Sequence, residues 1–195
     1  MDAACFGPQG PSRAFRPREV SATFLLGHLG IGLGLAWLLS WRSPARIDYR
    51  LVLFGAILPD LIDKPLGYVL GFQTRLWAHT FLFLFAILAL SFVPSLRTWR
   101  LVGFGVATHL LLDEIWDLPK VFWYPAYGWT FPAVPFSTDV WFEALLHDPY
   151  VQFGEIAGAI LLIAFAWVHG IRSWGAFRAF LRHGTLPPLP SGTLR

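Results

Sequence analysis

The stretch Leu101–Leu118 reads LVGFGVATHLLLDEIWDL and places His109 and Asp113 four residues apart in an otherwise apolar run. On a helix, residues four apart lie on one face at about 6 Å, so both side chains can bind one metal ion. An apolar run of this length approaches what is needed to cross a bilayer, where ionisable groups are costly unless they are paired. The pair therefore predicts a functional site inside a membrane helix.

The composition of the whole chain also indicates a membrane protein. Of its 195 residues, 55% are hydrophobic and 14% charged, with a mean hydropathy of +0.54, whereas soluble domains carry about 25% charged residues. The net charge is only +3 and the basic residues lie in short stretches, so no nucleic-acid partner is expected. Cys5 is the single cysteine, which excludes an internal disulfide and a cysteine-rich zinc site.

The apolar runs predict an all-α fold, a polytopic membrane helix bundle of about five hydrophobic segments. Each run is long enough to span about 27–33 Å as a helix. Pro59 and Pro65 flank three charged residues and predict that the second segment is broken. Flexible tails are expected at 1–19 and 184–195, around a single membrane domain at 20–183 whose loop at 119–150 is rich in aromatic residues and proline. The five segments cover residues 20–41, 51–72, 76–96, 101–118 and 151–171.

Polar residues interrupt four of these segments, and alternation of the helices would bring them together. If consecutive segments cross in opposite directions, all of these side chains lie in the same half of the bundle, roughly 5 to 15 Å from one surface. Imidazole and carboxylate ligands suit a divalent metal, zinc first, with manganese or iron as alternatives. The predicted metal ligands are His28, Asp60, Asp63, His79, His109 and Asp113.

Three motifs in this order resemble a known family. They are LPDLIDKP at Leu58–Pro65, RLWAHT at Arg75–Thr80 and HLLLD at His109–Asp113. Together they resemble the predicted membrane-bound metal-dependent hydrolases, also labelled LexA-binding, inner-membrane-associated hydrolases, over residues 22–135. The resemblance implies an integral protein of the prokaryotic inner (cytoplasmic) membrane with hydrolase activity. The chain departs from the family pattern at Thr74, where a histidine is usual, and its stretched aspartate motif leaves open whether Asp60 or Asp63 is the ligand.

A more distant similarity concerns the zinc-dependent phospholipase C and P1 nuclease group. The order Asp, His, then His-x-x-x-Asp in that group matches Asp60 or Asp63, His79 and His109–Asp113 here. A later His-x-x-x-Glu is missing, because Val151 precedes Glu155 by four residues. This similarity implies a phosphoester or lipid-like substrate.

Two residues outside the predicted ligand set are candidates for catalytic roles. Arg75 could hold an anionic group of the substrate, and Glu155, at the start of the fifth segment, is a candidate base. A divalent metal with an open position lowers the pKa of bound water to about 7, which suits hydrolysis. The alternatives are a cation-binding or transport protein that uses the same cluster, or a scaffold in which the polar groups only join helices.

Two further patterns bear on packing and on the membrane. Three Gly-xxx-Gly spacings, at Gly30/Gly34, Gly67/Gly71 and Gly154/Gly158, predict close helix packing. Arg172, Arg178 and Arg182 follow the fifth segment and predict a flank near anionic lipid. Membrane lipid is thus the expected partner, and the sequence leaves the oligomeric state open.

Overall fold

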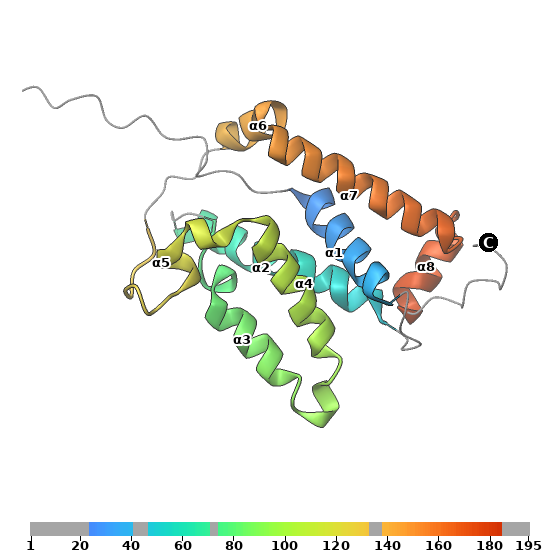
Figure 1. The fold of residues 1–195 in the computed structure, drawn as a ribbon, viewed down its shortest axis with the longest axis horizontal. Helices are drawn as coiled ribbons and strands as arrows, with labels where there is room; N and C mark the ends of the chain where they lie inside the picture. The colour runs from blue at the N-terminus through green and yellow to red at the C-terminus, as the bar shows by residue number, and fades with distance from the viewer. Residues whose placement is uncertain (1–23, 41–46, 71–73, 133–137, 185–195) are drawn as a thin grey trace, which may run out of the picture.

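The computed structural model describes residues 24–40, 47–70, 74–132 and 138–184, and in these ranges the chain forms helices and turns without a strand (Figure 1). The all-helical class predicted from the sequence is therefore confirmed. The α-helices are α1 (Leu25–Ser40), α2 (Tyr49–Leu70), α3 (Phe81–Leu90), α4 (Trp99–Leu112), α5 (Pro119–Phe122), α6 (Thr138–His147), α7 (Pro149–Val168) and α8 (Trp174–His183). Short 3₁₀ helices are η2 (Trp77–His79), η3 (Pro94–Leu96) and η4 (Ile115–Asp117).

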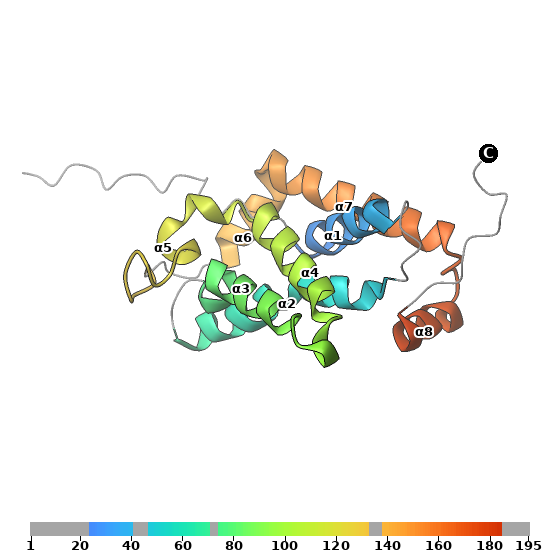
Figure 2. The ribbon, with the colours of Figure 1, turned by 60° about the horizontal axis from the view of Figure 1, so that its bottom comes forward.

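Two pairs of helices pack in parallel through glycine. A Cβ atom at Gly30 of α1 would lie 2.0 Å from the carbonyl oxygen of Gly158 in α7, so the two backbones touch there. In the second pair, a Cβ atom at Gly105 of α4 would lie 2.3 Å from the carbonyl oxygen of Val52 in α2. Both views show α1 beside α7, with the α3–α4 hairpin extending away from them (Figures 1 and 2). Small residues allow this close approach. The α1–α7 contact involves the predicted Gly30/Gly34 and Gly154/Gly158 spacings, whereas the α2–α4 contact was not predicted, and Gly71 of the third spacing lies outside the described residues.

Apolar side chains form two buried clusters. The first lies between α2, α3, α4 and the segment that follows α4, and contains Leu58, Ile87, Val102, Val106, Leu110, Ile115 and Val121. The second joins α1, α2, α7 and α8, and contains Leu33, Ala36, Tyr49, Val52, Phe165 and Phe180. The polar residues of the predicted site lie where α1, α2, η2 and α4 meet.

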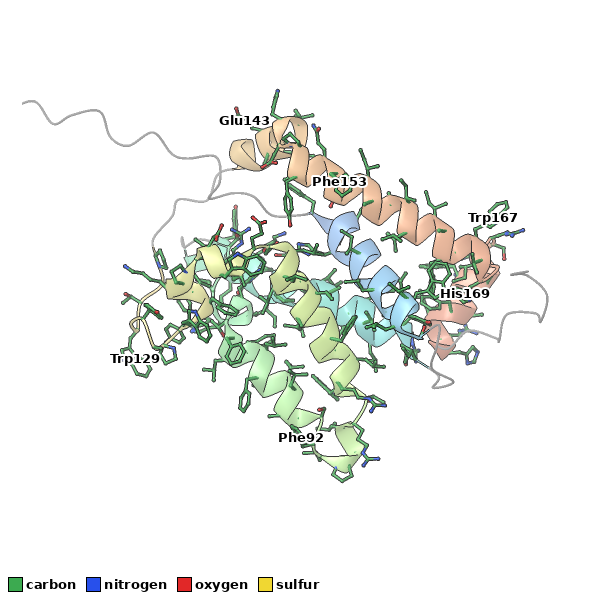
Figure 3. The ribbon with its side chains drawn as sticks, viewed as in Figure 1. Phe92, Trp129, Glu143, Phe153, Trp167 and His169 are labelled. Carbon is green, nitrogen blue, oxygen red and sulfur yellow. The ribbon has the colours of Figure 1, made fainter. Side chains whose placement is uncertain are left out.

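Apolar side chains also cover the outside of the molecule. On α7, five large apolar residues spaced three or four apart point outward, and Figure 3 shows Phe153 and Trp167 on this face: Phe153, Ile156, Ile160, Ile163 and Trp167. Contiguous apolar surface of this kind marks contact with lipid or another apolar partner rather than with water. Within the described residues, α7 is the one helix long and apolar enough to cross a membrane by itself.

Several helix boundaries differ from the sequence prediction. The second segment is not broken: α2 runs continuously through Pro59 and Pro65. Proline removes an N–H and crowds carbonyl groups of the preceding turn, which neighbouring helices can satisfy. Pro59 leaves the Gly55 carbonyl without its helical partner, and the next carbonyl, of Ala56, accepts a hydrogen bond from the His109 ring.

The third and fourth segments are shorter helices than predicted. Thr80 has an extended backbone, and its side chain accepts a hydrogen bond from the backbone N–H of Phe83, so α3 begins only at Phe81. α3 has 10 residues and α4 has 14. α4 ends before Glu114, which adopts a left-handed conformation with φ of 46°. A residue with a left-handed backbone conformation cannot continue a right-handed helix.

The remaining boundaries are close to those expected. α7 begins and ends within three residues of the predicted 151–171 segment, and α6 lies in the predicted 119–150 loop. α1 covers the described part of the first segment. The predicted tails at 1–19 and 184–195 lie outside the described residues, apart from Gly184, which caps α8.

Candidate metal centre

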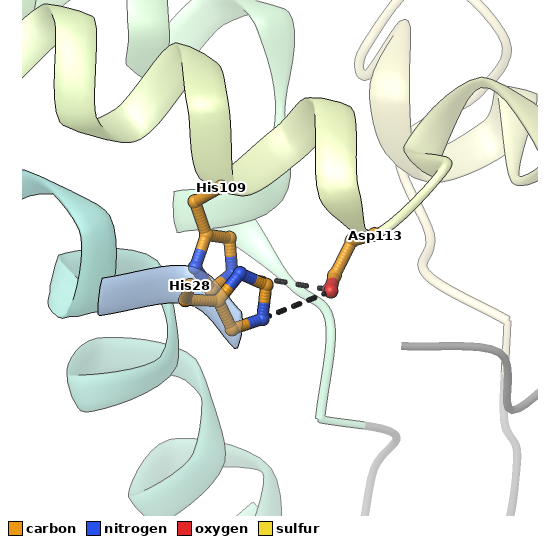
Figure 4. A group of neighbouring side chains, drawn as sticks. All are labelled: His28, His109 and Asp113. Carbon is orange, nitrogen blue, oxygen red and sulfur yellow. Dashed lines mark ion pairs between the residues drawn. The ribbon is translucent and has the colours of Figure 1, made fainter. Parts of the chain in front are cut away.

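Four elements bring the predicted ligands to one place. His28 is in the first turn of α1, Asp60 and Asp63 are in α2, His79 ends η2, and His109 and Asp113 stand at the end of α4. All except Asp60 are buried. Figure 4 shows His28, His109 and Asp113 converging, and the structure brings Asp60 and His79 to the same cluster. Asp63 lies behind His79.

Asp63 binds the turn that carries His79. Its carboxylate accepts hydrogen bonds from the backbone N–H groups of Leu76, Ala78 and His79, at 2.7 to 3.2 Å. The same carboxylate accepts from Nδ1 of the His79 ring at 2.7 Å. Nδ1 therefore carries a proton, and in the neutral ring the lone pair of Nε2 faces the cluster.

His109 is oriented in the same way by a backbone carbonyl. Its Nδ1 donates to the Ala56 oxygen at 2.7 Å, so the lone pair of its Nε2 is also free. The two Nε2 atoms, of His79 and His109, are 3.1 Å apart. Two nitrogen lone pairs at this distance repel unless a proton or a metal cation lies between them. A ligating histidine typically donates its other ring N–H to a carboxylate or carbonyl, as both rings do here.

A carboxylate oxygen of Asp60 and one of Asp113 lie near both of these nitrogens. Oδ1 of Asp60 lies 3.7 Å from Nε2 of His79 and 3.9 Å from Nε2 of His109. Oδ2 of Asp113 lies 3.6 and 3.8 Å from the same two nitrogens. Zinc with bonds of 2.0 to 2.1 Å separates its tetrahedral ligands by about 3.3 Å. The nitrogen–oxygen spacings are wider than this value, and the nitrogen–nitrogen distance of 3.1 Å is slightly shorter. The two nitrogens and the Asp60 oxygen lie close enough together to bind one ion.

Both carboxylates are held by basic side chains. Nε2 of His28 lies 3.2 Å from Oδ1 of Asp113, and Nε of Arg75 donates to its Oδ2 at 3.1 Å. Nζ of Lys64 donates to Oδ2 of Asp60, leaving Oδ1 toward the histidines. The His28 ring stacks on that of His109, with centroids 3.9 Å apart. Carboxylate ligands are commonly fixed by such outer hydrogen bonds.

His28 also belongs to a possible ligand group of its own. Ligand atoms of His28, His109 and Asp113 lie within 4.8 Å of one another, as do those of Asp60, His79 and His109. The two groups share His109, whose Nδ1 is already bonded to Ala56. Its Nε2 therefore serves one ion, so within these groups the geometry suits a single metal better than two independent ones.

Glu155, the candidate base, lies away from the ligand atoms. Its carboxylate accepts hydrogen bonds from the backbone N–H groups of Leu26 at 3.1 Å and Gly27 at 2.7 Å. These are free donors at the start of α1, where a carboxylate is favoured. Glu155 thereby fixes the turn that carries His28. Neither this contact nor the role of the Ala56 carbonyl is predicted from the sequence, because a long-range cap and a backbone acceptor have no local sequence signal.

The apolar exterior, the helical fold and the buried histidine–aspartate cluster define a helical membrane protein with a polar centre between its helices. The family model described as YdjM inner membrane protein matches residues 23–178, and the chain belongs to that family. No curated protein and no solved structure matches the chain. The inner membrane localisation predicted from the sequence is confirmed by the family.

Proposed function

We propose that this inner membrane protein binds one divalent cation, zinc first, through His79, His109, Asp60 and Asp113. The observation that carries the proposal is the 3.1 Å distance between two Nε2 atoms whose rings are both protonated at Nδ1. Two carboxylates beside these nitrogens supply compensating negative charge. Imidazole and carboxylate ligands at these spacings fit zinc, and they also admit manganese or iron.

The membrane part of the proposal is that α1, α2, α3 and α4 cross the bilayer together with α7. α1, α3 and α4 are short but apolar, and α2 has 22 residues. Short spans are tolerated where the bilayer thins locally or where neighbouring helices cover their ends. Crossing helices would place the metal centre in one leaflet, shielded from bulk water.

The activity we propose for this centre is hydrolysis of a phosphoester or lipid-like substrate. A bound divalent metal would supply an activated water and polarise the substrate oxygen. Arg75 contacts Asp113 and would bind an anionic substrate group beside the metal. Asp60 is the most exposed of the four proposed ligands, so the substrate would approach from its side. Lys64, paired with Asp60, adds positive charge on that side.

A non-hydrolytic cation-binding or transport protein is the second candidate, and one observation favours it. The proposed site has four protein ligands, the number that is typical of structural zinc sites. Catalytic zinc sites usually keep three protein ligands and an open position. Hydrolysis here would require that only three of the four residues hold the metal.

Metal analysis of the detergent-purified protein tests the shared part of both candidates. Wild type should carry about one metal ion per chain, and His79→Ala and His109→Ala should each lose it. His147→Ala is the matched control, because His147 is exposed on α6 and belongs to neither ligand group. Equal metal content in wild type and in both cluster variants would rule out the metal centre.

A substrate screen then separates the two candidates. Metal-loaded wild type in lipid vesicles is assayed with phosphoester and phospholipid substrates, and in parallel for uptake of the same metal. Hydrolysis that is lost in Arg75→Gln while metal is retained supports the hydrolase. Metal uptake without any hydrolysis would support the transport alternative instead.

A further inference from the structure

α8 carries an exposed apolar face. Trp174, Phe177 and Leu181 are spaced three and four residues apart, so they lie along one side of the helix. Their exposed fractions are 64%, 39% and 49%, respectively. The helix has defined ends, since the Ser173 side chain accepts from the backbone N–H of Ala176 and Gly184 provides a left-handed cap. The exposed face therefore belongs to a formed helix.

Arginine side chains border this face and stack on tryptophan. Arg178 and Arg182 are four residues apart and lie next to the apolar side chains on the helix surface. The guanidinium carbon of Arg178 lies 5.1 Å from the centre of the Trp174 ring. Arg172 lies 3.9 Å from the ring of Trp167, the exposed residue near the end of α7 (Figure 3). Tryptophan and arginine together are typical of the membrane–water interface.

The side of α8 that carries Phe180, next to the exposed apolar face, is fixed to the protein together with the C-terminal end of the helix. Phe180 is buried against Tyr49 and Phe165. Nη1 of Arg50 donates to the carbonyl oxygens of Leu181 at 2.8 Å and Arg182 at 2.7 Å, and the N–H of Tyr49 donates to Gly184. The outward direction of the Trp174 face is therefore set by the protein itself.

We infer that α8 lies in the membrane interface, with the Trp174, Phe177 and Leu181 face below the headgroups and the arginines bound to anionic phospholipid. α8 begins six residues after the end of the membrane-length helix α7, so it stands where that helix leaves the apolar layer. An amphipathic helix with aromatic residues on one face and arginine beside it binds anionic bilayers in this orientation. A second copy of this chain is the other possible occupant of the apolar face.

Depth measurement on the full-length protein in nanodiscs tests the orientation. Spin labels are placed at Phe177→Cys on the apolar face and, as control, at Ala179→Cys, which is exposed on another side of the helix. Cys5→Ser is the background for both. The label at residue 177 should be relaxed by oxygen and shielded from a water-soluble nickel chelate, and the label at 179 should show the reverse. Equal chelate access at both positions, or dipolar coupling between copies at residue 177, would overturn the inference.

Lipid charge tests the role of the arginines. The label at residue 177 should lie deeper in nanodiscs with phosphatidylglycerol than in phosphatidylcholine alone. Arg178→Gln/Arg182→Gln should abolish that shift. Arg97→Gln/Arg100→Gln makes the same change in net charge between η3 and the first turn of α4 and should retain the shift. An unchanged depth in the two lipids, or loss of the shift in the control pair, would contradict anionic lipid binding at α8.

Discussion

Asp63 contributes to the candidate metal centre without belonging to either group of ligand atoms. Both of its oxygens accept hydrogen bonds from backbone N–H groups, and Oδ2 also accepts from the His79 ring. A buried carboxylate saturated in this way has little capacity left for a metal. Asp60, one turn earlier, has an oxygen facing both histidines. At the residue scale, the two aspartates thus have different roles in the proposed site: Asp63 orients the His79 ring, and Asp60 is a proposed ligand.

Replacing Asp63 by Asn should weaken metal binding although no proposed ligand is removed. The amide can accept from fewer donors than the carboxylate, so the His79 ring loses its fixed orientation. Outer-shell changes of this kind reduce metal affinity by about 10–100-fold. Competition with a chromophoric chelator measures the affinity of the purified protein. Asp117→Asn, on the exposed η4 turn, is the control and should bind metal as wild type does.

The ion pair of Asp48 with Arg50 gives a second prediction, on pH dependence. The hydrogen bond from the Arg50 guanidinium lowers the pKa of Asp48, which precedes α2. A lowered folded-state pKa stabilises the protein fully above the unfolded value of about 3.9, and this contribution is lost as the pH falls through the folded value. Wild type should therefore unfold at higher denaturant than Asp48→Asn at neutral pH, by a modest margin because the pair is partly exposed.

Denaturant midpoints across the pH range check this sign. The difference between wild type and Asp48→Asn should stay constant above about pH 5 and shrink below about pH 4. A difference that grows on acidification would contradict the assignment. Arg50→Ala serves as a second variant. Its stability should change as little as that of Asp48→Asn when the pH passes through the range in which Asp48 is protonated. This variant also loses the hydrogen bonds to the end of α8.

At the scale of the elements, glycine contacts determine where α1 sits and hence where His28 points. A Cβ atom at Gly158 would lie 2.1 Å from the Leu26 carbonyl oxygen, a backbone atom that cannot move aside. One at Gly34 would meet only the Leu161 side chain, at 3.0 Å. The Gly-xxx-Gly spacings predict such packing, but they do not tell which helices pair. The structure shows that these glycines pair α1 with α7.

Gly158→Ala should therefore be more damaging than Gly34→Ala. The added methyl group forces α1 away from α7, which typically costs about 1–3 kcal/mol of stability. The shift should also draw His28 from Asp113 and lower metal affinity. Thermal unfolding in detergent, with metal affinity measured on the same samples, compares the two variants. Equal losses in both would show that the α1–α7 contact does not position His28.

Helix boundaries were only partly predictable from the sequence, for physical reasons that differ between elements. The long apolar run of α7, preceded by Asp148 and Pro149 at its start, predicts a helix from local sequence alone. The end of α4 depends on a left-handed Glu114 and the start of α3 on the Thr80 cap. α2 continues through Pro59 and Pro65, where proline and charge in the local sequence predict a break.

At the scale of the whole molecule, alternation of helix direction was enough to predict that the ligands converge. It required only the positions of His28, Asp60, His79, His109 and Asp113 along apolar runs, and the structure brings these five together. The division between ligands and outer partners could not be predicted, because it depends on side-chain directions and backbone hydrogen bonds. The basic residues after the fifth segment predicted a flank near anionic lipid, but not that α8 is a helix with its own apolar face.

Whether α4 crosses the bilayer decides between a polytopic bundle and a protein held by α7 alone. Its 14 residues span about 21 Å, less than a hydrocarbon core of about 30 Å, so the adjoining turns must contribute. Phe92, in the α3–α4 turn, and Tyr127, after α4, are exposed by 87% and 62% and lie beyond opposite ends of this helix. Cysteines at these two positions report on the crossing.

In a Cys5→Ser background, we expect Phe92→Cys and Tyr127→Cys to react with a membrane-impermeant maleimide from opposite sides. One should label in spheroplasts and the other only in inverted vesicles, because a single crossing by α4 separates them. Labelling of both from the same side would show that α4 does not cross. The histidine–aspartate cluster would then lie beside the membrane rather than within it, since His109 and Asp113 are at the end of that helix.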